Sequence, residues 1–398
     1  MSDPSLPVVR LRPKSRARDI RHGHPWAYAD DLVLDRRTRA LPPGSLAVLE
    51  DSERNPLGLV AVNPASKIAA RLLDRDSSAE VGPAWFAARL SRAQELRARL
   101  YPTPHYRLVH AEADGLPGVV IDRFGEAAVI QPNAAWADRL IEPLTEALVE
   151  LTGVETVVMN GMARARRLEG LENAARLLRG VLDGPVEVPM NGAVYLADLM
   201  GGQKTGLYYD QRDNHAFAAR LAGGGRVLDV FSHVGGFALA ALVAGATEAL
   251  AIDGSQAALD LAARGAEASG VADRLTTRRA DAFEALAAIG GEGARFDLVI
   301  CDPPAFAPSR QALERGLRAY ERLARLAAPL VSGGGFLVLC SCSHAADLTR
   351  FSAASIRGIG RAGRAAQLLH VGFAGPDHPQ LPQLAESGYL KALFFRLD

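Results

Sequence analysis

The chain has 398 residues, of which 48% are hydrophobic, and its formal net charge is zero. This length favours two or three domains, and the balanced charge excludes a chain that is polycationic throughout. Only three residues are cysteine, too few for a disulfide framework, so we expect a reducing, cytoplasmic environment. The first residues lack the apolar core of a secretory signal, and no apolar run is long enough to span a bilayer, so we expect no membrane partner.

Short β segments bounded by Gly and Pro turn signals fill the first part of the chain, and they predict a small β barrel over residues 1–78. Residues 79–188 mix helical and strand patterns, which predicts a small central α+β domain. The expected elements of this domain are a helix at 80–100, a hairpin at 107–131, a helix near 134–152 and a strand at 154–160.

In residues 189–398 predicted strands alternate with predicted helices, which indicates a mostly parallel, doubly wound α/β sheet. A long helix is expected from about 310 to 331. The last two strands have no helix between them, so we expect an antiparallel pair joined by the Pro-rich loop PDHPQLPQ. The expected strands are 226–231, 248–253, 273–281, 296–302, 334–343, 366–373 and 389–397.

Four consecutive strands of this sheet end on an aspartate, namely Asp229, Asp253, Asp281 and Asp302. Open α/β sheets bind ligands at the carboxyl ends of their strands. A single Asp there is often a helix cap or a turn residue, whereas four at corresponding positions indicate a binding site.

The acidic edge favours S-adenosylmethionine over a dinucleotide. The loop FSHVGGF is not the GxGxxG pattern that cradles a pyrophosphate, and an acidic edge would repel phosphate. S-adenosylmethionine carries a sulfonium and an ammonium instead. We expect Asp253 at the ribose diol, Asp281 beside the adenine and Asp229 near the methionine end. The predicted cofactor-binding residues are Asp229, Phe231, Ser232, His233, Gly235, Gly236, Asp253, Gly254, Asp281, Ala282 and Asp302, with the two glycines allowing close backbone approach.

The three cysteines differ in their surroundings. Cys301 and Cys340 lie within apolar runs and are interpreted as core residues, whereas Cys342 falls at a strand end among polar neighbours. A thiolate beside a methyl donor suits a pyrimidine, because its addition to C6 makes C5 nucleophilic enough to accept the methyl group. We therefore predict Cys342 as the nucleophile and Asp302 as the group that holds the N3/N4 edge of a cytosine. One Cys-x-Cys pair is poor zinc spacing, so no metal is expected.

Predicted substrate contacts lie in three places. Pro303 and Pro304 stiffen the loop after Asp302, and Phe306 could stack on a base. Basic residues would hold phosphates. The residues assigned to this role are Arg166 and Arg167 of the ARARR cluster and Lys204, since only four of the 45 basic residues are lysine and a lysine marks a place for a compact charge.

The chain also resembles the bacterial 23S rRNA cytosine-C5 methyltransferases that carry an N-terminal PUA domain. The resemblance rests on motifs along nearly the whole length, including RHGHPWAYAD, EADGLPGVVIDRFG, KTGLYYDQRDN, VLDVFSHVGGFALAAL, FDLVICDPPAF, the SCS around Cys342 and GYLKALFFR. It implies a PUA barrel, a small central domain and a class I methyltransferase domain. It also implies S-adenosylmethionine as cofactor, cytosine-5 methylation of rRNA before or during large-subunit assembly, and Cys342 as nucleophile.

Three positions depart from the family pattern. Ala305 stands where Lys is usual after Asp-Pro-Pro, His233 where Tyr is usual before the Gly pair, and His344 where Gly is usual after Ser-Cys-Ser.

Other functions remain open at the level of the sequence. One is an N-methyltransferase acting on an exocyclic amine, in which Cys342 serves only in packing. Another is an RNA-binding protein of ribosome assembly that holds the cofactor without turnover. The sequence also leaves open whether the chain forms a homodimer.

Overall fold

The computed structural model describes residues 6–202 and 206–398, and it divides into two compact units. Unit 1 comprises Met1–Gly184, Leu199–Gly206 and Pro376–Ser387, and unit 2 comprises Pro185–Asp198, Leu207–Gly375 and Gly388–Asp398. In the described parts of the chain, no helix is both long and apolar enough to cross a membrane.

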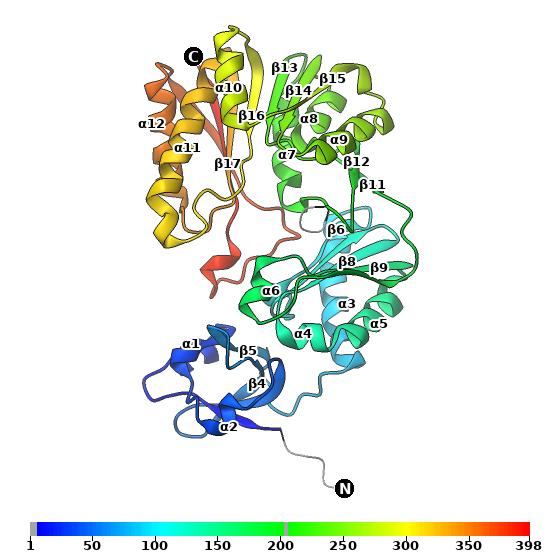
Figure 1. The fold of residues 1–398 in the computed structure, drawn as a ribbon, viewed down its shortest axis with the longest axis vertical. Coiled ribbons are helices and arrows are strands. Elements are labelled where there is room, and N and C mark those ends of the chain that lie inside the picture. Colours follow the sequence, from blue (N-terminus) through cyan, green and yellow to red (C-terminus); the bar gives the residue numbers. More distant parts are fainter. Residues whose placement is uncertain (1–5, 203–205) are drawn as a thin grey trace. The chain divides into compact units, whose positions relative to one another are not determined.

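The first part of unit 1 is a five-stranded sheet in the order β1-β3-β4-β5-β2, drawn in blue in Figure 1. Its β1 pairs with β3 in parallel, and the other pairs are antiparallel. Alternate residues such as Val9, Leu49 and Val60 face one core. The elements are β1 (Val8–Arg10), α1 (Ala17–Arg21), β2 (Trp26–Tyr28), α2 (Arg36–Arg39), β3 (Ser45–Glu50), β4 (Pro56–Val62) and β5 (Ile68–Asp74).

The second part of unit 1 is a five-stranded sheet in the order β10-β9-β8-β7-β6 with its own core. The single helix expected near 134–152 is interrupted at Leu140, which ends α4 and begins α5. In the core, the rings of Phe86 and Trp136 lie nearly parallel, with centroids 6.2 Å apart. The elements are α3 (Pro83–Leu100), β6 (His105–His110), β7 (Val119–Phe124), β8 (Ala127–Pro132), α4 (Ala135–Arg139), α5 (Ile141–Thr152), β9 (Thr156–Asn160), α6 (Arg164–Leu168) and β10 (Ala175–Arg179).

Unit 2 is built on a seven-stranded sheet in the order β15-β14-β13-β16-β17-β19-β18. Its strands run parallel except for β19, which is antiparallel to both of its neighbours. This order confirms the doubly wound, mostly parallel sheet with an antiparallel last strand that is expected of a class I methyltransferase fold. The strands are β13 (Arg226–Val230), β14 (Glu248–Asp253), β15 (Leu275–Arg279), β16 (Phe296–Cys301), β17 (Val331–Ser341), β18 (Ala366–Gly372) and β19 (Lys391–Leu397).

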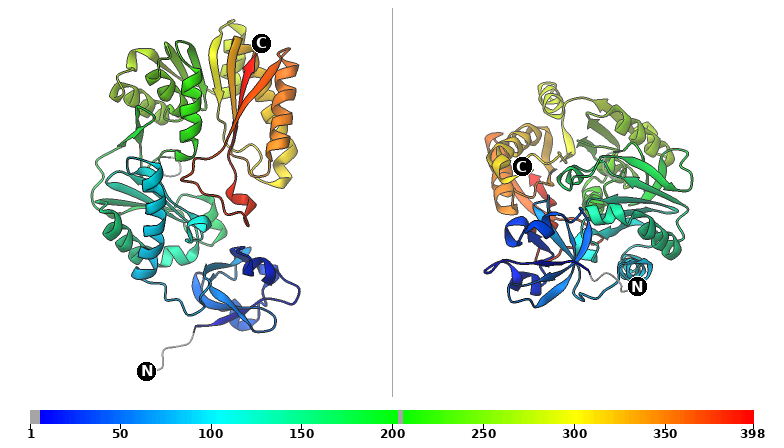
Figure 2. Two further views of the ribbon diagram at one scale, coloured as in Figure 1. Left: turned by 180° about the vertical axis from the view of Figure 1, so that it is seen from behind. Right: turned by 60° about the horizontal axis from the view of Figure 1, so that its bottom comes forward.

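Helices cover both faces of this sheet: Figure 1 shows the green α7–α9 on one side and the yellow to orange α10–α12 on the other. The expected long helix is observed as α11, which stops at Ala327, two residues before Pro329. Seen from behind in Figure 2, β18 and β19 lie side by side, as predicted. The helices are α7 (Arg212–Leu221), α8 (Gly236–Val243), α9 (Gln256–Ala268), α10 (Ala282–Gly291), α11 (Leu313–Ala327) and α12 (Leu348–Arg361).

A short hairpin, β11 (Val186–Met190) with β12 (Ala193–Ala197), opens unit 2. The domain boundary expected after residue 188 falls inside β11. The division into domains at 78 and 188 therefore remains a prediction.

The loop between β18 and β19 contributes Pro376–Ser387 to unit 1 rather than to unit 2. There the buried Asp377 accepts a hydrogen bond from the backbone N–H of Arg107 at 3.0 Å, and its own carbonyl accepts one from Arg97 at 2.8 Å. Arg97 is itself buried and makes a bidentate ion pair with Asp114, at 2.6 and 2.8 Å. The Pro-rich loop is thus an ordered part of unit 1, which its sequence did not reveal.

Candidate active site

Asp229 lies near the carboxyl end of β13, a central strand of the unit 2 sheet, and is fully buried. Its Oδ2 accepts the backbone N–H of Ala238 at 2.9 Å, and its buried Oδ1 has no partner among the described residues. Burial raises the pKa of Asp229 to about 7 against the opposing effects of the backbone N–H groups of Ala238 and Phe237, and the carboxylates of Asp302 and Asp253 raise it further. A buried, unpaired oxygen with this pKa fits a cationic ligand group, such as those of S-adenosylmethionine.

The loop between β13 and α8 has a strained backbone. Phe231 and His233 adopt positive φ angles of +64° and +50°, which side-chain-bearing residues rarely do, and Gly235 follows at +80°. At Gly236 a Cβ would lie 2.7 Å from the ring of the buried His215, so a side chain there would have to displace the imidazole. The Oγ of Ser232 is buried without a partner in the described structure. A strained, glycine-lined loop with an unsatisfied hydroxyl is typical of a ligand-binding turn.

Asp253, the last residue of β14, shapes this loop from the neighbouring strand. One carboxylate oxygen accepts the N–H of His233 at 2.9 Å and the other accepts the N–H of Ser255 at 2.8 Å. The side chain is partly exposed, and each oxygen can accept a second hydrogen bond. A role at the ribose diol is therefore compatible with its role in the loop, and it remains a proposal.

Asp281 is the N-cap of α10, and its carboxylate accepts the N–H groups of Phe283 and Glu284 at 2.9 and 3.1 Å. It is exposed, as is Gly254, whereas Ala282 is buried. These capping hydrogen bonds explain the presence of an aspartate at position 281 even if it contacts no ligand. Its predicted place beside the adenine is thus a proposal that the local structure permits but does not require.

The structure confirms the different surroundings of the three cysteines. Cys301 and Cys340 are 0% and 1% exposed, whereas Cys342 is half-buried and follows the last residue of β17. Its Sγ lies 4.0 Å from the carbonyl oxygen of Pro303. The predicted nucleophile therefore faces the Asp-Pro-Pro loop, where Asp302 is half-buried and Pro304 is exposed.

A buried hydroxyl network fixes the two loops that meet at Cys342. The Tyr320 hydroxyl lies 2.8 Å from the Oγ of Ser341 and 2.7 Å from the Oγ of Ser343. The same Ser343 Oγ accepts the N–H of Ala307 at 2.9 Å, and its carbonyl accepts a bond from the buried Lys391 at 2.8 Å. The serines on both sides of Cys342 are thus held in place, which orients the thiol between them.

Phe306 belongs to an aromatic cluster. Its ring lies 4.9 Å from Tyr320, 6.0 Å from Phe283 and 6.4 Å from Phe231, measured between centroids. The ring is only partly exposed. It joins the Asp-Pro-Pro loop to the core, and base stacking by its exposed part remains a proposal.

Sequence reasoning missed Tyr208. Its ring packs edge-on against His233, with centroids 4.9 Å apart, and it interacts electrostatically with Asp302, Cys342 and Asp253. Burial, aided by these acidic groups, raises its pKa, so its hydroxyl stays protonated and can donate. Its position in KTGLYYDQRDN was the available signal, but only the fold brings it to the strand ends.

The three basic residues predicted to contact phosphates differ in their surroundings. Arg166 is buried, and its guanidinium bonds to the carbonyls of Pro132 and Glu172 and to the carboxylate of Asp138. Because these contacts occupy it, Arg166 supports the fold of unit 1, and we correct its assignment to the substrate. Arg167 is exposed. Lys204 lies outside the described residues.

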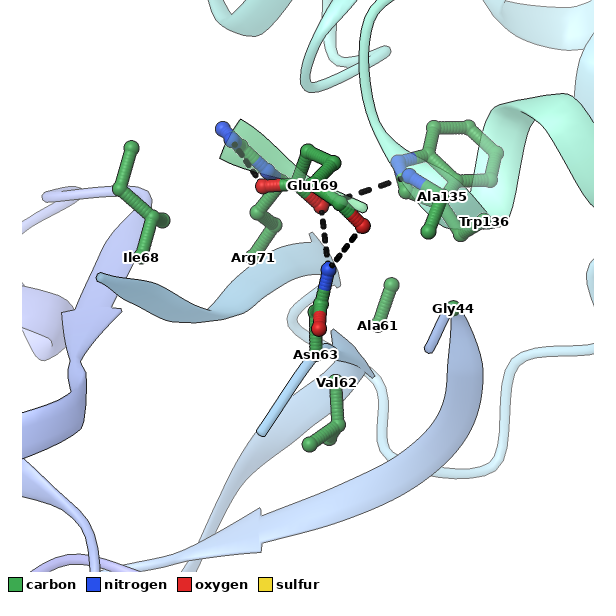
Figure 3. Close-up of a pocket in the computed structure, with 9 residues that line it drawn as sticks. All are labelled: Gly44, Ala61, Val62, Asn63, Ile68, Arg71, Ala135, Trp136 and Glu169. Carbon is green, nitrogen blue, oxygen red and sulfur yellow. Dashed lines mark hydrogen bonds and ion pairs between the residues drawn. The ribbon is translucent and has the colours of Figure 1, made fainter. Parts of the chain in front are cut away.

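Unit 1 holds a small pocket around the buried carboxylate of Glu169, shown in Figure 3. Glu169 accepts bonds from Asn63 at 3.0 Å, from Ser66 at 2.9 Å and from Arg71 at 3.0 Å. The backbone N–H of Ala135 approaches the same carboxylate at 3.4 Å. These contacts satisfy the carboxylate, so the cluster joins the two parts of unit 1. In the described ranges, no group of three or more His, Cys, Asp or Glu side chains could hold a metal ion.

Comparisons with known proteins give the family of this chain. A family model for a PUA-like domain matches residues 9–75, and one for S-adenosylmethionine-dependent methyltransferases matches residues 160–396. The protein named ribosomal RNA large subunit methyltransferase I of Erwinia tasmaniensis is 33% identical over 98% of this chain and 100% of its own. The chain belongs to the ribosomal RNA large subunit methyltransferase I family. A ribosomal RNA large subunit methyltransferase of Deinococcus radiodurans is 35% identical over 99% of this chain and 98% of its own.

Solved structures show that the fold of this family member is shared. A SAM-dependent methyltransferase from Streptococcus mutans has a TM-score of 0.82 at 18% identity and covers 98% of this chain and 100% of its own. A methyltransferase complexed with SAH has a TM-score of 0.83, also at 18% identity and with the same coverage. The expected PUA-like and methyltransferase folds are therefore confirmed. The chain is an S-adenosylmethionine-dependent methyltransferase, and the orphan oxygen of Asp229 and the glycine-lined loop fit that cofactor.

Proposed function

We propose that this enzyme methylates C5 of a cytosine in the ribosomal RNA of the large subunit. Cys342 would act as the covalent nucleophile. The names of its relatives support the RNA substrate. One observation carries the choice of C5: Cys342 is the partly exposed cysteine, and it faces the Asp-Pro-Pro loop beside the acidic strand ends. Methylation at a ring carbon needs a nucleophile of this kind, whereas methylation at nitrogen does not.

We assign the covalent step to Cys342 and the support of the base to Asp302. The Cys342 thiolate adds to C6, so an S–C6 bond forms, the C5–C6 double bond breaks, and its electron pair makes C5 nucleophilic. Bound S-adenosylmethionine supplies an electrophilic methyl group to C5. Loss of the C5 proton to a base then restores the double bond and expels the thiolate. Asp302 would hold the N3/N4 edge of the ring and stabilise the adduct.

Residues at the strand ends would hold the cofactor. We assign the cationic methionine end to Asp229, because its buried Oδ1 lacks a partner in the described structure. Asp253 and Gly254 would meet the ribose, and Asp281 and Ala282 the adenine. The Gly235–Gly236 turn leaves room for the cofactor next to the backbone.

The substrate is expected to reach this site as unstacked RNA, because a base within a duplex cannot approach the thiol. Arg167, together with basic residues of the PUA-like domain, would hold phosphates, so binding should weaken as salt concentration rises. The proposed substrate is 23S rRNA before or during assembly of the large subunit.

The decisive experiment identifies the methylated nucleoside. The protein is incubated with labelled S-adenosylmethionine and ribosomal RNA from a strain that lacks its gene, and the digested RNA is analysed by mass spectrometry. We expect labelled 5-methylcytidine from the wild type. The Cys342→Ala variant should lose at least about a thousandfold in rate while still binding the cofactor.

Cys340→Ala is the matched control, because it removes a buried thiol two residues away, within β17, and should keep most activity. A labelled N-methyl nucleoside, or full activity of Cys342→Ala, would refute the C5 mechanism and favour transfer to an exocyclic amine. Tight binding of RNA and cofactor without any label would favour a binding role in ribosome assembly.

A further inference from the structure

Lys391 is a buried lysine with no carboxylate counter-ion in the described structure. It is the first residue of β19, is 5% exposed, and pairs with Ser341 of β17 across the sheet. Its Nζ donates one hydrogen bond, to the carbonyl oxygen of Ser343 at 2.8 Å. In the part of the chain that the structure describes, no carboxylate lies within 4.0 Å of this nitrogen. Burial lowers the pKa of Lys391, as expected for an ammonium removed from water.

A buried ammonium is unfavourable unless an anion lies close to it. Two groups favour the charged form of Lys391: Cys342 first, and Asp347 second. Asp347 is exposed and caps α12 through the N–H of Arg350 at 2.8 Å, so water screens its charge. Lys391 pairs with Ser341 and donates a hydrogen bond to the carbonyl of Ser343, and Cys342 is the residue between these two serines. A thiolate there would supply the missing negative charge.

Two tyrosines also lie within electrostatic range of Cys342, and neither carries a positive charge. Tyr208 and Tyr320 both interact with it electrostatically, and both are phenols whose pKa is raised by burial, so they stay neutral. Asp302 begins the loop whose Pro303 carbonyl contacts the thiol, and its carboxylate opposes a second negative charge. Lys391 is a cation that this site offers to the thiolate, because its Nζ lies 2.8 Å from the carbonyl oxygen of the next residue, Ser343.

We propose that Lys391 is a positioning residue for the nucleophile: its ammonium stabilises the Cys342 thiolate and fixes the Ser341–Ser343 turn through the Ser343 carbonyl. This inference deepens the proposed function and rests on Cys342 being the nucleophile of that reaction. It assigns a role in catalysis to a residue on a neighbouring strand, far along the chain from the thiol.

The test measures the thiolate directly, without methyl transfer. The rate of alkylation of Cys342 by iodoacetamide is followed from pH 5.5 to 10 by mass spectrometry of the full-length protein, with Cys342→Ser identifying the modified site. Because Cys301 and Cys340 are buried, they should react slowly. We expect an apparent pKa for Cys342 at least one unit below the ordinary thiol value of about 8.5.

At pH 7, Lys391→Met should slow alkylation about tenfold or more, since a pKa raised by one unit removes nine-tenths of the thiolate. Lys391→Arg, which keeps the charge, should recover most of the rate. Equal effects of Met and Arg would mean a purely structural role and would overturn the proposal. If Lys391→Met does not fold, the wild-type profile decides alone: an apparent pKa of 8.5 or above overturns it.

The two proposals fail in different ways. A low apparent pKa without 5-methylcytidine would refute the C5 reaction and leave the Lys391–Cys342 relationship standing. Labelled 5-methylcytidine that depends on Cys342, with a pKa unmoved by Lys391→Met, would keep the reaction and refute the role of Lys391.

Discussion

The backbone N–H of His233 donates a hydrogen bond to Oδ2 of Asp253, 2.9 Å away, so the last residue of β14 holds the loop that follows β13. The loop cannot relax independently of the neighbouring strand. This explains how Phe231 and His233 keep positive φ angles, which cost free energy that the surrounding contacts must offset. The shape of this loop is thus maintained by contacts within the chain itself.

The close approach of Gly236 to His215 gives the first prediction. A Cβ at Gly236 would lie 2.7 Å from the buried imidazole ring, so Gly236→Ala should displace the start of α8. Overpacking of this kind costs about 1–3 kcal/mol. We expect a lower melting temperature and at least tenfold weaker binding of S-adenosylmethionine, measured by calorimetry.

Gly360→Ala is the control for this prediction, because Gly360 is an exposed helical position where an added Cβ would meet no described atom within 4 Å. It should leave cofactor binding unchanged and slightly stabilise α12. Wild-type affinity in Gly236→Ala would show that the turn tolerates a side chain and has another function.

The buried carboxyl of Asp229 predicts a pH dependence of stability. Its pKa in the folded state is about 7, whereas an unfolded Asp has a pKa of about 3.9. Between these values the folded state holds a proton that the unfolded chain releases, so stability without cofactor falls as pH rises from about 4 to 7. This one group contributes at most about 1.4 kcal/mol per pH unit.

Asp229→Asn should remove this contribution. Urea unfolding at pH 5 and pH 7.5 should show that the wild type loses more stability than the variant across this interval. Asp260→Asn, which changes an exposed carboxylate on α9, serves as control and should follow the wild type. Parallel curves for wild type and Asp229→Asn would mean that Asp229 is ionised in the folded protein.

The sequence predicted the parts of the site that depend on local order. Alternating strands and helices placed Asp229, Asp253 and Asp302 at one edge of the sheet, because parallel strands end together. The apolar runs around Cys301 and Cys340 likewise predicted their burial. These conclusions needed only the distribution of apolar residues along the chain and the rule that parallel strands end at the same edge of an α/β sheet.

Contacts between distant segments could not be predicted in this way. The pairing of Ser341 with Lys391 follows from the position of β19 beside β17, whereas the scarcity of lysine in the chain led only to the assignment of Lys204. An Arg-rich cluster does not reveal which member turns inward, so Arg166 was misassigned. The break at Leu140 also escaped detection, because its neighbours on both sides are helical.

The hydroxyl of Tyr320 predicts a coupling between the serines on both sides of Cys342. Tyr320→Phe removes the group that lies within 2.8 Å of both hydroxyls and leaves Ser341 and Ser343 buried with fewer partners. We expect a loss of about 1–2 kcal/mol in stability and a slower methyl transfer with unchanged cofactor affinity. A double-mutant cycle of Tyr320→Phe with Ser341→Ala should give a coupling above about 0.5 kcal/mol. Strict additivity would mean that the hydroxyls do not act together.

The carboxylate of Glu169 predicts a large effect on unit 1. Glu169→Ala would leave Asn63, Ser66 and Arg71 without their shared acceptor, and Arg71 would keep one ion pair, with Glu112 at 3.1 Å. Removing one partner of a buried ion pair costs about 3–5 kcal/mol, so we expect unit 1 to unfold at clearly lower urea concentration. Glu172→Ala, at an exposed side chain three residues further on, should change stability by less than about 0.5 kcal/mol. Equal midpoints for the two variants would show that the two parts of unit 1 are held together without the Glu169 cluster.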